Sequence, residues 1–164
     1  MTTIAATTRM IAADSQVTVD ESSYLSPKLM MFEDAAMGAA GDAEACHMFF
    51  DWWPKRDTTK LDIPAEMELE CLVLTRDGKL YRYGKYAKPD YIRDGLMAVG
   101  SGSAIAIASM DTMLHLGLVP DPQIAVAVAS KRSPDTGGPI DVFTIEQINE
   151  PRAKPVRSRK RAGP

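Results

Sequence analysis

The residues with the clearest chemical potential stand at the start of the chain, where Thr2 follows Met1. An initiator methionine is readily removed when the next side chain is small, so we expect the mature chain to begin with Thr2. A threonine at a free N-terminus carries a hydroxyl nucleophile and an amine base on one residue, which is a known way to activate a weak nucleophile. Many chains begin Met-Thr without using this chemistry. The hypothesis of an N-terminal nucleophile therefore depends on supporting residues elsewhere in the sequence.

Length and composition fit one globular domain. A chain of 164 residues with 45% apolar and 25% charged residues can bury a sizeable core. No apolar run approaches the length of a membrane span, and residues 1–13 contain Arg9 and no basic start, so they do not resemble a signal peptide. Cys46 and Cys71 are too few for a disulfide framework and are predicted to be small buried side chains. We expect a cytoplasmic protein.

The end of the chain differs in charge from the rest. Residues 151–164 hold six cationic side chains and no acid, and without those six charges the net charge of −3 would become −9. We expect a single domain over residues 2–150 and a disordered tail over residues 151–164. A solubilising or weakly docking tail is favoured over a dedicated nucleic-acid arm, and weak binding of a polyanion stays open. The cationic residues are Arg152, Lys154, Arg157, Arg159, Lys160 and Arg161.

The hydrophobic pattern predicts many strands and few helices. Strands are expected at residues 2–6, 10–19, 28–32, 35–40, 67–75, 79–83, 96–99 and 140–145. Helices are expected at residues 42–53, 104–117 and 123–130. The segments 20–23 and 86–95 are expected to be a polar connection and an irregular stretch. Because strands and helices do not alternate regularly, the order predicts antiparallel sheets with helices packed outside, an α+β layered fold.

Several segments follow one another in the order and spacing of one family. With Thr2 leading, the chain resembles the proteasome β-subunit and the bacterial HslV protease, which are N-terminal nucleophile (Ntn) hydrolases. The resemblance implies a four-layer αββα sandwich of two antiparallel sheets flanked by helices. It covers the chain from Thr2 to about Ile145. The matching segments are Thr2-Thr3-Ile4, Ala12-Ala13-Asp14-Ser15-Gln16-Val17-Thr18, Lys28-Leu29, Gly38-Ala39-Ala40-Gly41, Gly100-Ser101-Gly102-Ser103 and residues 135–142.

The chain departs from the family at two places. The segment between Trp53 and Met67 is short, so the family's long second helix is expected to be missing. The acidic residue that supports the terminal amine in proteasomes falls on Ser133, with Asp135 two residues later. The proteasomal serine beside the amine falls on Thr136, which keeps a hydroxyl. The resemblance therefore describes a short, divergent member.

The resemblance assigns the catalytic roles. Thr2 would supply the nucleophilic Oγ and, with a reference amine pKa of about 8, its own base. Lys28 would keep that amine neutral, with Asp14 as the partner that a buried lysine needs. Gly41, just before a helix, would donate a backbone N–H to the oxyanion. The hydroxyls of Ser101 and Thr136 would contact the amine or hold a water that relays a proton.

Each of these residues has an ordinary alternative. Taken alone, Asp14 would more often be a turn residue, Lys28 a solvated strand residue and Gly41 the start of a helix. Ser101 could belong to a simple turn or to a weak phosphate-binding loop, although the segment lacks the Lys-Thr or Lys-Ser of a P-loop. Taken together at the family's spacing, these residues favour an active site.

Specificity follows from the same resemblance. The first substrate pocket is expected to be open and apolar and to accept a bulky apolar side chain. Its lining would be Val17, Ser26, Met30, Ala39 and Ala43. No group of cysteine, histidine and carboxylate residues has metal-ligand spacing, so neither a metal nor another cofactor is expected.

The leading functional hypothesis is a threonine peptidase that assembles into a homo-oligomeric ring. It would degrade unfolded polypeptide delivered by an ATP-dependent unfoldase. The runner-up is a catalytically silent scaffold or binding protein that uses the basic tail for a partner, and the loss of acid at Ser133 motivates it. A weaker third hypothesis is an amidase that acts on a small molecule.

Overall fold

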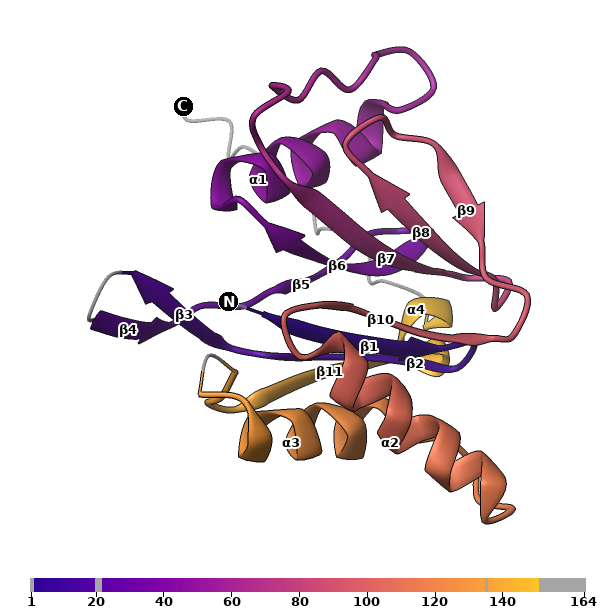
Figure 1. Ribbon diagram of the computed structural model, residues 1–164. Coiled ribbons are helices and arrows are strands. Elements are labelled where there is room, and N and C mark those ends of the chain that lie inside the picture. Colours follow the sequence, from indigo (N-terminus) through magenta and orange to yellow (C-terminus); the bar gives the residue numbers. More distant parts are fainter. Residues whose placement is uncertain (1, 20–21, 135, 151–164) are drawn as a thin grey trace, which may run out of the picture.

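Two antiparallel sheets lie face to face, with helices on both outer faces (Figure 1). The computed structural model describes residues 2–19, 22–134 and 136–150, so the predicted tail lies outside the described residues. Helix α1 covers the outer face of one sheet, and α2 and α3 cover the outer face of the other. The predicted α+β class with its αββα layers is therefore confirmed. No helix of the described residues is long and apolar enough to cross a membrane.

The four-stranded sheet carries the start of the chain. Its order is β10-β1-β2-β11, and β1 lies between β10 and β2, with Thr3 paired to Gly100 on one side and Ile4 paired to Ala13 on the other. Alternate residues of β1 face opposite ways, as the period of a strand requires. The elements are β1 (Thr3–Thr7), β2 (Met10–Asp14), β10 (Leu96–Gly100), β11 (Ile140–Thr144), α2 (Ser103–His115) and α3 (Pro122–Arg132).

The five-stranded sheet has the order β5-β6-β7-β8-β9 and forms the other half of the sandwich. Its strands β6 and β7 are almost continuously apolar because one face packs on α1 and the other on the four-stranded sheet. The elements are β5 (Leu29–Met31), β6 (Ala35–Gly41), β7 (Leu69–Thr75), β8 (Leu80–Gly84), β9 (Pro89–Tyr91), α1 (Ala43–Trp52) and the 3₁₀ turn η1 (Trp53–Lys55).

Three layers of core hold these elements together. The core between the sheets is aliphatic, whereas the core under α1 is aromatic, with Phe49 at 5.5 Å from the ring of Tyr83. Under α2 and α3 the buried side chains are mostly alanines, which allow the helices to approach the sheet closely. Full burial of one large apolar side chain stabilises the fold by about 1.5–3 kcal/mol, so the aromatic layer fixes α1 beside the cleft described below.

The structure corrects four predictions of secondary structure. The expected strand 10–19 is broken at Ser15, whose hydroxyl donates to the carbonyl of Pro139 at 2.8 Å. The polar connection 20–23 is wrong at Ser22 and Ser23, because β3 (Gln16–Val19) pairs with β4 (Ser22–Leu25). The irregular segment 86–95 contains edge strand β9. The strand expected at residues 140–145 ends at Thr144, and Ile145 begins α4 (Ile145–Asn149), which starts with a capping box.

Other predictions of local structure hold. Residues 56–68, all of which the structure describes, form turns and loop without a helix, as the short segment predicts.

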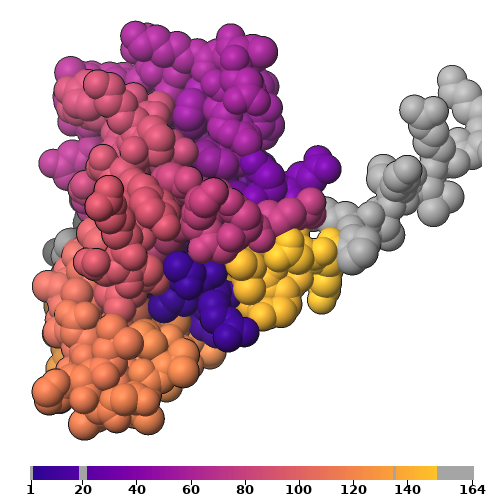
Figure 2. All heavy atoms as spheres, turned by 90° about the vertical axis from the view of Figure 1, so that its right-hand side faces the viewer, coloured from indigo at the N-terminus to yellow at the C-terminus, as the bar shows by residue number. Residues whose placement is uncertain are grey.

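The turn between β1 and β2 lies at the end of the molecule opposite Thr2. Figure 2 looks onto that end, where the turn (indigo) lies beside α4 (yellow) and below the five-stranded sheet (magenta).

Candidate active site

The turn after β10 holds Thr2 at two points. The backbone nitrogen of Thr2 donates to Ser101 Oγ at 3.3 Å, and Ser101 Oγ donates to the carbonyl oxygen of Thr2 at 3.3 Å. Gly100, with φ of +86°, lies so close that an added Cβ would stand 2.1 Å from the same carbonyl oxygen. Only glycine combines this backbone conformation with so close an approach. The Gly100-Ser101 turn therefore fixes where Thr2 stands.

A buried ion pair lies next to Thr2. Lys28 Nζ stands 2.9 Å from Asp14 Oδ2 and also donates to the carbonyl oxygen of Gln16 at 2.5 Å. The carboxylate of Asp14 is fully buried and accepts three backbone N–H groups, from Thr3 at 2.7 Å and from Gln16 and Gly137 at 3.2 Å. Such bonds offset the large desolvation cost of a buried charge. The expected contact between Lys28 and Asp14 is thus present.

Burial changes the proton affinity of Lys28. Desolvation lowers the pKa of its ammonium below the ordinary value, and the hydrogen bond and charge of Asp14 oppose this shift. The ammonium thus gives up its proton more readily than that of a lysine on the surface. The predicted chemistry uses the charged ammonium, which the hydrogen bond and the charge of Asp14 favour.

Thr136 contacts Thr3 and not Thr2 in the hydrogen bonds of the structure. The two hydroxyls are 2.9 Å apart and both residues are buried. Because neighbouring residues of a strand face opposite ways, Thr2 lies toward the space between the sheets and Thr3 toward α3. The observed bond therefore joins Thr136 to the residue after the predicted nucleophile, and its proposed contact with the amine stays a prediction.

A cleft of about 1240 Å³ opens beside Thr2. Most predicted site residues line it, whereas Asp14 and Thr136 are buried behind its wall and Met30 is not among its lining residues. Met30 lies on β5 with 45% of its surface exposed. The predicted residues that line the cleft are Thr2, Val17, Ser26, Lys28, Ala39, Gly41, Ala43 and Ser101.

The start of α1 forms one edge of the cleft. Gly41 has φ of +120°, and an added Cβ would stand 2.2 Å from the carbonyl oxygen of Glu68. Asp42 is bound to Glu68 twice, since its N–H donates to that carbonyl at 2.9 Å and its carboxylate accepts the N–H of Glu68 at 2.6 Å. Glycine at position 41 is thus required by the backbone, whatever its role in catalysis.

Sequence reasoning missed the residues of α1 and β7 in the cleft. Cys46, His47 and Phe50 follow Ala43 at intervals of three, four and seven, which is the spacing of one helix face and could have revealed them. Desolvation, followed by the charge of Asp42, raises the pKa of the Cys46 thiol to about 11. Cys46 is therefore a neutral, weakly nucleophilic part of the wall at neutral pH.

No protein-family model matches this sequence, and no curated protein matches it by sequence. Solved structures do match its fold. BPH of Thiobacillus denitrificans in complex with epoxomicin is 14% identical with a TM-score of 0.68, over 87% of this chain and 97% of that one. HslV of Trypanosoma brucei is 17% identical with a TM-score of 0.67, over 87% and 98%. The chain has the Ntn-hydrolase fold of HslV and the proteasome.

A more distant Ntn-hydrolase fold matches as well. A Gly-1 mutant of Anbu from Hyphomicrobium sp. strain MC1 is 11% identical with a TM-score of 0.65, over 88% of this chain and 81% of that one. At identities this low, the structural similarity shows the fold alone. The chemistry must be inferred from the residues of the site. Among the described residues no group of three or more His, Cys, Asp or Glu side chains could hold a metal ion.

Proposed function

We propose that this protein is an N-terminal threonine peptidase that hydrolyses peptide bonds in unfolded polypeptides. One observation carries the proposal: Thr2 is bound by Ser101 at the edge of a large cleft that Lys28 also lines. The Ntn-hydrolase fold supports it, because a nucleophile at the start of β1 is what that fold is named for. The proposal requires removal of Met1, since only then does Thr2 carry the α-amine.

The reaction begins with attack by Thr2. Its Oγ forms a bond to the carbonyl carbon of the substrate as the proton of Oγ passes to the α-amine of Thr2. The charge of Lys28, balanced by Asp14, keeps that amine neutral before the attack and stabilises the developing alkoxide. The oxyanion of the tetrahedral intermediate accepts the N–H of Gly41 at the positive end of α1.

Breakdown of the intermediate completes the cycle. The α-ammonium of Thr2 gives its proton to the leaving nitrogen, the C–N bond breaks, and the acyl part stays on Oγ as an ester. A water molecule then attacks the ester carbonyl while the same amine takes its proton. The bond between the acyl carbon and Oγ breaks, Oγ takes the proton back from the α-ammonium, the carboxylic acid leaves and Thr2 is restored. Ser101 and Thr136 are proposed to hold the amine or a relaying water.

Substrate and assembly are part of the same proposal. The acyl side chain would lie against Val17, Ala39 and Ala43, where the small apolar wall suits a bulky apolar side chain. We propose a homo-oligomeric ring fed by an ATP-dependent unfoldase, which the fold shared with HslV supports. Light scattering of the purified protein at micromolar concentration tests the ring, and a monomer there would contradict it.

A second candidate is a catalytically silent scaffold with the same fold. It is favoured by Ser133, the residue that ends α3, because no carboxylate stands at the position where proteasomes carry one. The basic segment 151–164 would then bind an acidic partner or, weakly, nucleic acid. The two candidates differ in whether Thr2 reacts.

The deciding experiment measures the intact mass of untagged protein before and after exposure to a peptide epoxyketone, an electrophile directed at N-terminal threonine. We expect loss of Met1 and a single adduct that maps to Thr2. Lys28→Met should prevent the adduct. Lys79→Met is the matched control, because Lys79 also pairs with an aspartate, Asp77 at 2.7 Å, but on the surface. A chain that begins at Thr2 and forms no adduct would favour the scaffold.

A further inference from the structure

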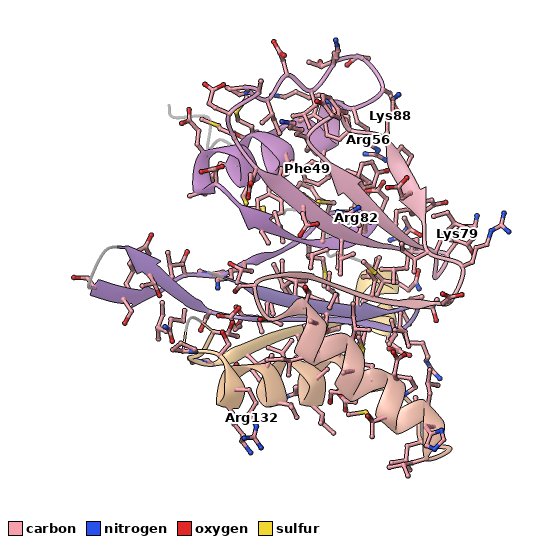
Figure 3. The ribbon with its side chains drawn as sticks, in the orientation of Figure 1. Phe49, Arg56, Lys79, Arg82, Lys88 and Arg132 are labelled. Carbon is pink, nitrogen blue, oxygen red and sulfur yellow. The ribbon has the colours of Figure 1, made fainter. Side chains whose placement is uncertain are left out.

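A second ion pair reaches the Thr2 site from the opposite sheet. Arg82 Nη2 lies 2.5 Å from Glu70 Oε1, and Arg82 Nη1 lies 4.0 Å from Asp90 Oδ2. Arg82 is paired with Leu72, a residue of the core between the sheets, so its side chain shares that inner face. Glu70 stands two residues before Leu72 on β7 and lies on the same face. Figure 3 labels Arg82 within the five-stranded sheet.

Glu70 connects this pair to the turn that holds Thr2. Its Oε2 accepts the backbone N–H of Gly100 at 3.4 Å, across the gap between the sheets. The next residue is Ser101, whose hydroxyl binds the nitrogen of Thr2 at 3.3 Å. Glu70, Gly100, Ser101 and Thr2 all line the same cleft. The carboxylate is thus joined to the Thr2 nitrogen through one short turn.

We propose that Glu70 and Arg82 are positioning residues of the Thr2 site, which anchor the Gly100-Ser101 turn and balance the charge around the Thr2 amine. This inference deepens the proposed function and rests on it. Neither residue contacts the reacting atoms. Glu70 acts through the turn, and Arg82 acts by compensating the charge of Glu70. The pair is partly exposed, with 37% of the Arg82 side chain and 42% of the Glu70 side chain accessible, so both can be substituted without opening the core.

The two substitutions are expected to shift the protonation of the Thr2 amine in opposite directions. Glu70→Gln keeps an acceptor for the N–H of Gly100 but removes one negative charge near the amine and leaves Arg82 with Asp90 alone at 4.0 Å, which favours the neutral amine. Arg82→Met leaves Glu70 uncompensated, which favours the protonated amine. One unit charge roughly 10 Å from an amine, at an effective dielectric constant of about 40, shifts its titration midpoint by roughly half a pH unit. Both substitutions leave the other ionisable groups around the site unchanged. These groups are Asp14, Tyr24, Lys28, Asp42, Cys46, His47, Glu66, Glu68, Lys85, Tyr86 and Asp90.

The test is a competitive acetylation of the α-amine as a function of pH. The protein is prepared with a fusion partner that is cleaved directly before Thr2, and the acetylated N-terminal peptide is quantified by mass spectrometry. We expect the midpoint of labelling to fall in Glu70→Gln and to rise in Arg82→Met. Arg82→Gln replaces the second variant if Arg82→Met does not fold. Glu146→Gln is the matched control, since Glu146 pairs with Arg9 at the other end of the sheet.

The outcomes separate this inference from the proposed function. Opposite shifts in the two variants, with none in Glu146→Gln, support the positioning role. Midpoints that stay unchanged, or move in the same direction in both variants, would overturn the positioning role. The pair would then only stabilise the packing of the two sheets through the contact between Glu70 and Gly100. Because labelling of the amine requires no catalysis, it gives this answer even where the epoxyketone forms no adduct and the peptidase proposal fails.

Discussion

Two ion pairs at the two ends of the same sheet show how strongly burial changes the role of one kind of contact. Asp14 and Lys28 lie beside Thr2, with 0% and 6% of their side chains exposed. Arg9 and Glu146 lie at the far end, with 74% and 62% exposed. Each pair joins a segment near the start of the chain to a later one, at 2.9 and 3.5 Å respectively. They differ mainly in access to water.

The difference in solvent access decides what each pair can do. Water screens the surface pair, so its free energy is small and its geometry loose. The buried pair has lost that water, and backbone N–H groups of three segments replace it at Asp14. A carboxylate bonded in this way fixes the strands around it and holds Lys28 beside Thr2. The proposed chemistry thus depends on the ion pair that is costly to bury.

The largest effect is expected from Asp14→Asn. This change leaves Lys28 buried without its counter-charge and should lower the free energy of unfolding by about 3–5 kcal/mol. Urea denaturation at neutral pH measures it. The double variant Asp14→Asn/Lys28→Met removes the stranded charge and should recover part of the loss. A single variant as stable as the unchanged protein would show that the pair is not a buried one in solution.

The second largest effect is expected at the turn that holds Thr2. Gly100→Ala places a Cβ against the carbonyl oxygen of Thr2 and should cost about 3 kcal/mol. Displacement of Thr2 should also slow epoxyketone labelling by roughly tenfold or more. Gly117→Ala is the control, since Gly117 also has a positive φ of +73° but no atom within 4 Å of an added Cβ.

Gly117→Ala separates the penalty of the backbone conformation from the effect of the contact between Gly100 and Thr2. Gly117→Ala should cost only the left-handed backbone penalty, about 1 kcal/mol, and leave labelling unchanged. Equal losses of stability in the two variants would mean that the backbone conformation alone matters. The contact between Gly100 and Thr2 would then have no influence on the site.

The sequence predicted most of the fold and part of the site, for identifiable reasons. Strand and helix periodicity located α1, α2, α3 and the long strands, because their apolar faces are continuous. It missed the β3–β4 pairing, since Ser22 and Ser23 are exposed and carry no apolar signal. The Asp14–Lys28 contact followed from the resemblance, whereas the catalytic roles stay predictions.

Contacts between sheets were beyond the reach of the sequence. Glu70 is the only acid in the apolar run Leu69–Thr75 and is visible as an exception, but its partner Arg82 lies on the neighbouring strand β8 and its partner Gly100 on β10 of the other sheet. The contact with Gly100 depends on how the two sheets stack. Met30 is not among the residues that line the cleft, and its role in the pocket stays a prediction.

Alkaline pH should destabilise the protein through a buried group of the cleft. The pKa of Cys46 is raised from 9.0 to about 11, so its contribution is fully present below pH 9 and is lost as the pH rises through 11. Allowing for partial exposure, the loss is roughly 1–2 kcal/mol at pH 11. Cys46→Ala should lose less stability than the unchanged protein between pH 9 and 11 in urea denaturation. An identical loss would place the thiol in contact with water.

The smallest effect is expected from the surface pair of Arg9 and Glu146. Glu146→Gln removes the charge facing Arg9 and should change the free energy of unfolding by less than about 1 kcal/mol, since both side chains are mostly exposed. The change should shrink further in 1 M salt, because the Debye length there is about 3 Å. A loss comparable to that of Asp14→Asn would mean that contact with Arg9, not burial, sets the strength of these pairs. The helix of Glu146 would then hold the β1–β2 turn as firmly as Asp14 holds Lys28.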